Sequence, residues 1–291
     1  MNSLIATVLD LDVALGGNAD LLLGGGLGLY LKQEHLRATG ARTVLPLDRL
    51  PQARTTEDID LFLRAEVIAS RDDVLRYRGA LDSLGFEVVE EARWMKFKRA
   101  VRGVEVVLDV MVGPLGEYAR GVKVGGLRVR PRDLEAADGL HARRTDDALG
   151  VERSPMRLVV EGTRSDTSAG SCEVLVPRAF PYAIMKLGAL HDRIDDVNKQ
   201  EGRHHAMDLY RIVGILTEEE AEVSARLAAD YSGDARVAKA LRTIDSLLAP
   251  RDGLGRIRLL EYQRTNRATC PELDPEFLVA ELRRLLSPPD D

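Results

Sequence analysis

Over the first 35 residues, hydrophobic positions recur every three to four residues, which is the spacing of an amphipathic helix. Gly16-Gly17-Asn18 interrupts this pattern, so it predicts two helices. The second helix carries Leu21–Leu31 and has Gly24-Gly25-Gly26 inside it. Glycines inside a helix cost roughly 1 kcal/mol each. We therefore expect the backbone at these glycines to come close to another group.

Beyond a proline-containing loop at 40–54, the pattern changes to short apolar runs and to alternation, both typical of strands. We expect strands at 58–63, 86–89, 94–98, 104–112, 122–129, 158–160 and 173–176. A helix at 71–84, ended by Gly85, separates the first two, and Arg102-Gly103 predicts a turn. After Pro177 the pattern is helical almost to the end, at 180–196, 203–215, 217–230, 234–248 and 275–286.

This change of pattern predicts two domains, and a chain of 291 residues is long enough for both. We expect an α/β (α+β) domain with a mixed sheet at residues 1–176. A helical-bundle domain is expected to follow at residues 177–291.

Charge and composition exclude several classes of protein. Acidic residues (47) outnumber Lys and Arg (41), and the formal net charge of −6 excludes a globally basic coat protein for nucleic acid. A local basic groove stays possible. The two cysteines, Cys172 and Cys270, lie too far apart for a CxxC motif, and no disulfide framework is expected. With no basic start and no apolar run near the roughly 20 residues that span a bilayer, the sequence predicts a cytoplasmic protein with no membrane partner.

Three aspartates form the main candidate for chemistry. Asp58 and Asp60 stand two apart in a strand, so both side chains point to one face while Ile59 and Leu61 point to the other. Asp109 is the acid inside another apolar strand, where burial is penalised. Adjacent carboxylates repel unless a hard divalent cation lies between them, and such a trio suits nucleotidyl or phosphoryl transfer. The alternative is a row of solvent-facing acids on an edge hairpin.

A second pair of aspartates, Asp10 and Asp12, is similar to the motif of haloacid-dehalogenase phosphatases. That motif needs Gly-Thr shortly after the second Asp, whereas Val13-Ala14-Leu15 follows here. The apolar spacing favours a helix that exposes both acids to solvent.

Two blocks of the sequence resemble a known family. Gly25-Gly26-Leu27-Gly28-Leu29 followed by Arg54-Thr55-Thr56-Glu57-Asp58-Ile59-Asp60 is similar to its "GG-x-A-L … R-x-[ST]-x-D-I-D" signature. The stretch Pro181–Leu190 with Arg193, followed by His205–Leu209, is similar to its "L-x-x-K-L-x-A-L-x-x-R … K-D-x-x-D-L" block. The family is the AbiEii-type, MenT-like toxin branch of the polymerase-β-like nucleotidyltransferases. The chain departs from it by an insertion around 38–52 and by His204-His205 in place of "K-D".

The resemblance implies a nucleotidyltransferase whose active site lies between its two domains. Asp58, Asp60 and Asp109 would bind Mg²⁺ carrying a nucleoside triphosphate, and Asp109 would assist deprotonation of the acceptor. The residues implied to hold phosphates or the nucleotide are Gly25, Gly26, Arg54, Thr56, Lys186 and Arg193. Asp208 would be needed for activity. The resemblance further implies a toxin that acts on the 3′ end of tRNA and is controlled by a cognate antitoxin.

Other interpretations of these residues stay open. Gly25 and Gly26 also suit tight helix packing, and Lys186 with Asp208 would also tie two helices together. The stretch Arg93–Arg102 is basic and carries aromatics, so it suits either a nucleic-acid groove or a solvated hairpin face. A zinc site at His191, His204 and His205 fits no standard spacing; these are expected to be surface residues. The alternative function is a non-catalytic nucleotide- or partner-binding module on a decayed transferase fold.

Overall fold

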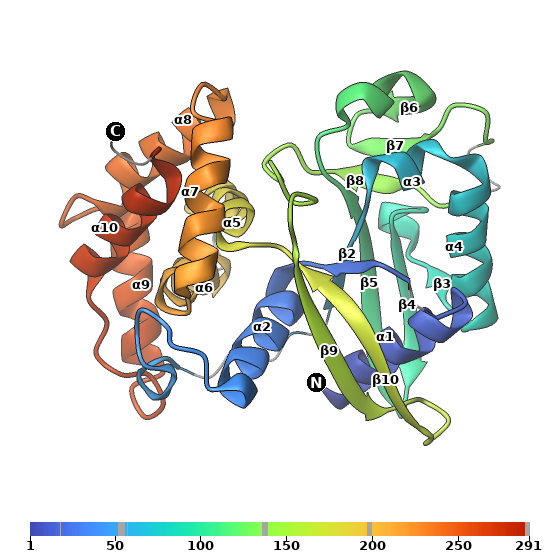
Figure 1. Ribbon diagram of the computed structural model, residues 1–291, viewed down its shortest axis with the longest axis horizontal. Coiled ribbons are helices and arrows are strands. Elements are labelled where there is room, and N and C mark those ends of the chain that lie inside the picture. The colour runs from blue at the N-terminus through green and yellow to red at the C-terminus, as the bar shows by residue number, and fades with distance from the viewer. Residues whose placement is uncertain (18, 52–55, 57, 136–138, 197–199, 289–291) are drawn as a thin grey trace. The chain divides into compact units, whose positions relative to one another are not determined.

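The computed structural model describes the chain except for residues 18, 52–55, 57, 136–138, 197–199 and 289–291 (Figure 1). It is an α/β protein with a mixed sheet and many helices. The chain forms two compact units. The first comprises Met1–His35, Ala53–Asp146 and Pro155–Pro177, and the second comprises Leu36–Gln52, Asp147–Ser154 and Arg178–Asp291.

The first unit is built on one sheet with the strand order β6-β7-β8-β5-β2-β1-β10-β9, and β4, itself paired with β3, also pairs with β5. The strands are β1 (Leu21–Leu23), β2 (Asp58–Leu63), β3 (Glu87–Val88), β4 (Lys96–Val101), β5 (Val104–Val112), β6 (Val122–Gly125), β7 (Arg128–Pro131), β8 (Ala142–Arg144), β9 (Met156–Thr163) and β10 (Ala169–Val176). The pairs β2–β5, β5–β8 and β1–β10 are parallel, and the others are antiparallel. The helices that begin in this unit are α1 (Asn2–Ala14), α2 (Gly25–Thr39, whose residues from Leu36 belong to the second unit), α3 (Ala65–Ala69) and α4 (Arg71–Ser83).

The two central strands alternate between an apolar and a polar face. Ile59 and Leu61 of β2, with Leu108 and Val110 of β5, are at most 1% exposed. The helix α1 contacts β4, β5, β9, β10 and α4, and so contributes to the core on this sheet. The opposite face of β2 and β5 carries the aspartates. The strands expected at 58–63 and 104–112 are confirmed, and so is the turn at Arg102-Gly103, where both residues have positive φ.

The leucine run before the glycines is a strand, so the helix expected from Leu21 is wrong at its start. Leu21–Leu23 form β1 between β2 and β10, and α2 begins only at Gly25. All three leucines are at most 1% exposed, and a fully buried short run has no periodicity that separates strand from helix. The glycines therefore stand at the start of the helix rather than inside it.

Residues 122–129, expected to be one strand, belong to a hairpin instead. β6 and β7 pair across Gly126, which has a φ of 62° and so makes the reversal that a continuous strand excludes. The strand β8 and the short helix α3, which the sequence pattern did not indicate, lie beside this hairpin (Figure 1).

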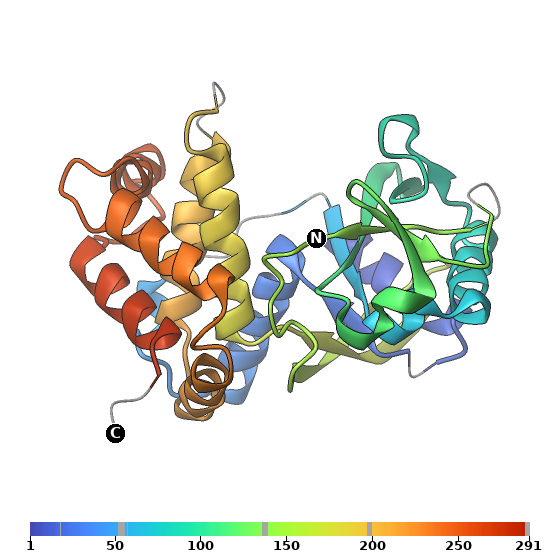
Figure 2. The same ribbon diagram turned by 90° about the horizontal axis from the view of Figure 1, so that it is seen from above.

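In the second unit the described elements from residue 179 onward are helical. They are α5 (Ala179–Arg193), α6 (Gln200–Gly214), α7 (Glu218–Asp230), α8 (Ala235–Thr243) with a π turn at Ile244–Leu248, α9 (Leu254–Thr265) and α10 (Pro275–Leu286). Of these, α9 was not expected. The helix α5 contacts α6, α7 and α8, and α6 contacts α9 and α10 (Figures 1 and 2). Among the described helices, none has the length and apolar character needed to cross a membrane.

Candidate functional site

Three carboxylates converge on the polar face of the sheet. Asp60 and Asp109 are direct partners in the parallel pairing of β2 and β5, and Asp58 lies two residues earlier on the same face of β2. One carboxylate oxygen from each lies within 4.8 Å of the others. Among the described residues, this is the one cluster of three or more His, Cys, Asp or Glu side chains that could hold a metal ion. Because β2 and β5 are interior neighbours of the sheet, the edge-hairpin alternative is wrong.

The charges around this group come from neighbouring strands. Lys96 of β4 stands opposite Asp109, and its Nζ lies 2.9 Å from Asp109 Oδ2. Arg143 of β8 has an Nη2 3.9 Å from Asp109 Oδ1. Asp109 is 8% exposed, whereas Asp58 and Asp60 are partly exposed. The arrangement gives three clustered oxygen donors open to solvent on the β2 side, and such donors suit Mg²⁺ or a similar hard cation.

The glycines lie directly against this group. The Gly24 N–H donates to the backbone oxygen of Asp60 at 2.8 Å. Gly25 has a φ of 57°, and a Cβ at this position would overlap Oδ2 of Asp60. A Cβ on Gly26 would lie 3.1 Å from Cβ of Thr56. The close approach is therefore between the start of α2 and the carboxylate strand, and it explains why residues without side chains stand there.

Thr56 and Arg54 were expected to contact phosphates. Thr56 is buried, and its hydroxyl donates to Oδ1 of Asp58, so in this structure it positions a carboxylate. Arg54 lies outside the described residues.

Two of the residues expected to act in the second unit, Lys186 and Asp208, belong to a buried ionic cluster. Nζ of Lys186 on α5 lies 2.7 Å from Oδ2 of Asp208 on α6, and Nη1 of Arg211 lies 2.9 Å from Oδ1 of the same carboxylate. The side chains of Asp208 and Arg211 are 1% exposed, and that of Lys186 is 10% exposed. Lys186 and Asp208 therefore join two helices, which is one of the roles expected for them. Arg211 was missed, although its place three residues after Asp208 on one helix face was the available signal.

Arg193, expected to bind nucleotide, stands at the end of α5. Its side chain is 57% exposed, and its Nη1 lies 3.2 Å from Oδ2 of Asp196. Its surroundings therefore differ from those of buried Lys186, although the two residues are seven apart on one helix.

Asp10 and Asp12 are helical, but the expectation that solvent covers them is wrong. They are 7% and 5% exposed. Nη2 of Arg99 lies 2.7 Å from Oδ2 of Asp10, and Oδ1 of Asp12 accepts from the backbone N–H of Ala19 at 3.0 Å. Asp10 therefore joins α1 to β4, whereas Asp12 stabilises the turn that directly follows α1.

That ion pair also corrects the interpretation of Arg93–Arg102. Arg99 is buried against Asp10, and Phe97 is 0% exposed, so neither side chain is available to a nucleic acid. Lys96 and Lys98 lie on the opposite face of β4, where they pair with Asp109 and Glu105. Of the two interpretations left open for this stretch, a groove that uses Phe97 and Arg99 is therefore wrong. Lys96 and Lys98 lie on the face of β4 that carries the carboxylates.

The histidines and cysteines contribute no site in the described residues. His191 pairs with Asp192 on the surface, and His204 packs its edge against Tyr262. The two cysteines are free and buried, and burial raises the pKa of the Cys172 thiol to about 11. A thiol with that pKa is protonated at neutral pH and is a poor nucleophile or ligand.

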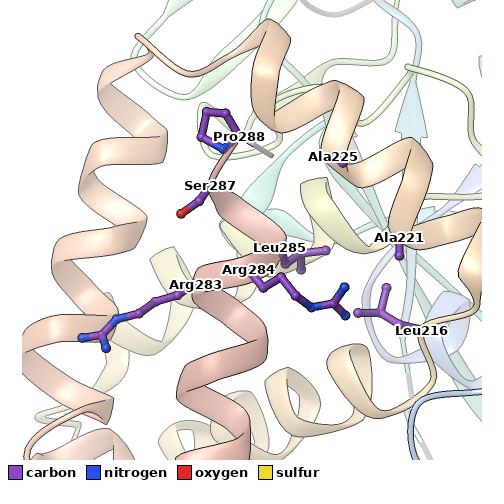
Figure 3. Close-up of a pocket in the computed structure, with 8 residues that line it drawn as sticks. All are labelled: Leu216, Ala221, Ala225, Arg283, Arg284, Leu285, Ser287 and Pro288. Atoms are coloured by element: carbon purple, nitrogen blue, oxygen red, sulfur yellow. The ribbon is translucent and has the colours of Figure 1, made fainter. Parts of the chain in front are cut away.

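A surface pocket lies in the second unit at α7 and α10 (Figure 3). Its lining residues are Leu216, Ala221, Ala225, Arg283, Arg284, Leu285, Ser287 and Pro288. None of the residues expected to act in catalysis or nucleotide binding is among them. Within the pocket, Arg284 forms an ion pair with Glu281, and Arg283 forms one with Asp245.

Comparisons of the chain with family models, with curated proteins and with solved structures give no match.

Proposed function

We propose that the protein is a Mg²⁺-dependent nucleotidyltransferase that moves a nucleoside monophosphate from a nucleoside triphosphate to an acceptor hydroxyl and releases pyrophosphate. The observation that carries the proposal is the carboxylate group of Asp58, Asp60 and Asp109, with the N-terminus of α2 at Gly25 packed against Asp60. Clustered carboxylates supply oxygen donors for a metal, and backbone N–H groups at a helix start suit phosphate oxygens.

Each residue near the site has a defined task in this reaction. Asp58 and Asp60 would hold the metal, and Thr56 fixes the orientation of Asp58 through its hydroxyl. Asp109 would accept the proton of the acceptor hydroxyl, since it is the buried member of the group. Bound Mg²⁺ would neutralise charge on the triphosphate and favour the attacking oxygen. Gly25 and Gly26 would admit the triphosphate close to the start of α2, which places it for in-line attack.

The acceptor we propose is the 3′ end of tRNA, and the protein would act in the cytoplasm as the toxin of a toxin–antitoxin pair. This part depends on the short motifs that resemble AbiEii-type and MenT-like enzymes: Gly25–Leu29, Arg54–Asp60 and the block from Pro181 to Leu209. By the same resemblance, Arg54, Lys186 and Arg193 would bind nucleotide phosphates, and Asp208 would support Lys186.

The direct test supplies purified protein with total RNA, Mg²⁺ and each of the four nucleoside triphosphates labelled at the α-phosphate. Label in the tRNA band for one triphosphate is the expected result. Label in protein or in a small molecule would support the transferase activity but contradict RNA as the acceptor. Absence of label in every fraction, with no pyrophosphate released, would contradict the proposed function.

A second candidate is a non-catalytic module that binds Mg²⁺-nucleotide without turnover. The observation in its favour is the Lys96–Asp109 pair at 2.9 Å, because an ammonium already balances the third carboxylate. Calorimetry with a triphosphate and Mg²⁺ separates the two candidates. Binding heat without pyrophosphate release over hours, in the presence of total RNA, would favour the module.

A further inference from the structure

Basic side chains gather on the three short strands β6, β7 and β8. The segment from Tyr118 to Arg132 contains five basic residues and no Asp or Glu. β6 and β7 form the hairpin, and β8 joins it to β5, the strand of Asp109 (Figure 1). We name four of these side chains the basic track: Lys123, Arg128, Arg130 and Arg143.

The pairing of the strands sets these cations directly opposite one another. Lys123 of β6 is the partner of Arg130 on β7, and Arg128 of β7 is the partner of Arg143 on β8. Like charges directly opposite across strands destabilise a sheet. In the described residues, no acidic side chain forms an ion pair with Lys123, Arg128 or Arg130 to relieve this repulsion. Two such pairs in succession concentrate positive charge that an anionic ligand would neutralise.

Two guanidinium groups of the track also have donors without acceptors. Nη1 of Arg130 and Nε of Arg143 are shielded from solvent and make no hydrogen bond within the part of the chain that the structure describes. A shielded donor without a partner costs free energy, so a shift of the side chain that brings the donor to an acceptor on a ligand is favoured. Phosphate oxygens suit guanidinium groups in charge and in geometry.

The side chains of the basic track lie on the outer face of these strands, because the opposite face is buried in the core. Val122, Val129 and Ala142 are at most 2% exposed and hold that face against the core. Lys123 and Arg128 are exposed, whereas Arg130 and Arg143 are partly exposed.

The track continues to the carboxylates. Arg143 is the partner of Met111 on β5, two residues after Asp109, and its Nη2 lies 3.9 Å from Asp109 Oδ1. Strands are spaced about 4.8 Å apart, so the row from β6 to β8 extends about 10 Å before it meets the site.

We propose that the basic track binds the phosphate backbone of a nucleic-acid strand whose end reaches Asp109. This rests on the proposed function, because it assigns the docking surface of the acceptor to that same site. A row across three strands suits successive phosphates of a chain better than one triphosphate. The net charge of −6 requires that binding be local, and the track is a local concentration of charge.

The test measures binding of a fluorescein-labelled oligouridylate to the full chain as salt rises. Four phosphate contacts with a single strand predict about 50-fold weaker binding at 200 mM than at 50 mM salt. The double variant Lys123→Gln/Arg128→Gln removes two contacts and should reduce that change to about 7-fold. The control is Arg76→Gln/Arg157→Gln, which removes the same charge from side chains 56% and 59% exposed elsewhere in the first unit.

Two further measurements, the melting temperature and the preference for RNA over DNA, distinguish the basic track from a solvated charged surface. Because the double variant removes one cation from each opposed pair, its melting temperature without nucleic acid should equal or exceed that of the wild type. An oligodeoxyuridylate of the same length reports whether the 2′-hydroxyl is read: tighter binding of the ribose strand assigns an RNA acceptor, and equal binding assigns backbone recognition alone. Either supports the track.

The inference is overturned if the double variant keeps the affinity and the salt dependence of the control. Its failure is distinguishable from that of the proposed function. If the double variant transfers nucleotide to RNA with an unchanged KM, the basic track is not the RNA-binding surface, but the proposed enzyme activity stands. If the wild type binds oligouridylate but never transfers label, and the double variant loses that binding, the basic track stands and the proposed enzyme activity is wrong.

Discussion

The ammonium of Lys96 lies 2.9 Å from Oδ2 of Asp109 because the antiparallel register of β4 and β5 sets the two residues opposite each other. Asp109 in turn is the partner of Asp60 across β5 and β2. Lys96, with Arg143 farther away, thus offsets only part of the charge of three carboxylates, and a metal ion would have to compete with the Lys96 ammonium for Asp109.

Lys96→Met should make the protein more responsive to Mg²⁺. Without metal, the carboxylates lose a counter-charge, and the stability should fall by about 1 kcal/mol or less because the pair is partly exposed. With Mg²⁺ the competing ammonium is gone, so the rise in melting temperature should begin at a lower metal concentration. Lys98→Met is the control, since Lys98 pairs with exposed Glu105 on the same strand. Identical Mg²⁺ titrations for the two variants would contradict this role of Lys96.

Gly25→Ala should displace the carboxylate of Asp60. The new Cβ overlaps Oδ2 of Asp60, and the φ of 57° is itself strained for alanine. Gly40→Ala is the matched control, because Gly40 has a φ of 65° and nothing within 4 Å of its Cβ position. We expect Gly25→Ala to lose about 1–3 kcal/mol more than the control, as in overpacked sites. Chemical denaturation checks it, and equal losses would show that the close approach relaxes freely.

Lys186→Met should destabilise the second unit strongly. It removes one of two cations that hold the buried carboxylate of Asp208, and we expect a loss of up to about 3 kcal/mol. Arg193→Met should change stability little, since the Arg193 pair is exposed. Melting temperature and triphosphate affinity are measured together on both variants. A Lys186 variant that keeps its melting temperature but binds triphosphate poorly would contradict the structural tie and leave phosphate binding as its role.

Alkylation of the two buried thiols, Cys172 and Cys270, should be slow in the folded protein and fast once it unfolds. Burial raises the pKa of Cys172 to about 11 and also raises the pKa of Cys270, against a usual value of 9.0. The Cys172 thiol is therefore protonated in the folded chain at pH 9, where a thiol with the usual value is about half ionised, and the shift of Cys270 acts in the same direction. Because the folded pKa is the higher one, folding loses stability as the pH rises above 9. Iodoacetamide labelling at pH 9 checks this, and rapid labelling of both thiols under native conditions would refute it.

The carboxylate site could be predicted because its information is local. In β2 and β5 the alternation of apolar and acidic positions fixes which face each Asp takes, and that pattern is visible in six to nine residues. The start of α2 was harder, because Leu21–Leu23 are buried on every side and leave no period to interpret.

The rest depended on pairings between distant residues. Arg99 and Asp10 are 89 residues apart, so no local pattern could show that they form a buried ion pair. The strands β6 to β8 are three or four residues long, too short for alternation to stand out. The opposed cations of the basic track became visible only with their register.

The most direct test of the central claim is Mg²⁺-dependent transfer of α-labelled nucleotide to RNA by Asp60→Asn, beside Glu105→Gln. Glu105 is an exposed acid on β5, paired with Lys98 and outside the carboxylate group, so its variant controls for loss of one negative charge. We predict no transfer by Asp60→Asn, with a melting temperature without Mg²⁺ at or above that of the wild type because one repelling charge is gone. Transfer by Glu105→Gln should equal the wild type. Wild-type transfer by Asp60→Asn would contradict the account.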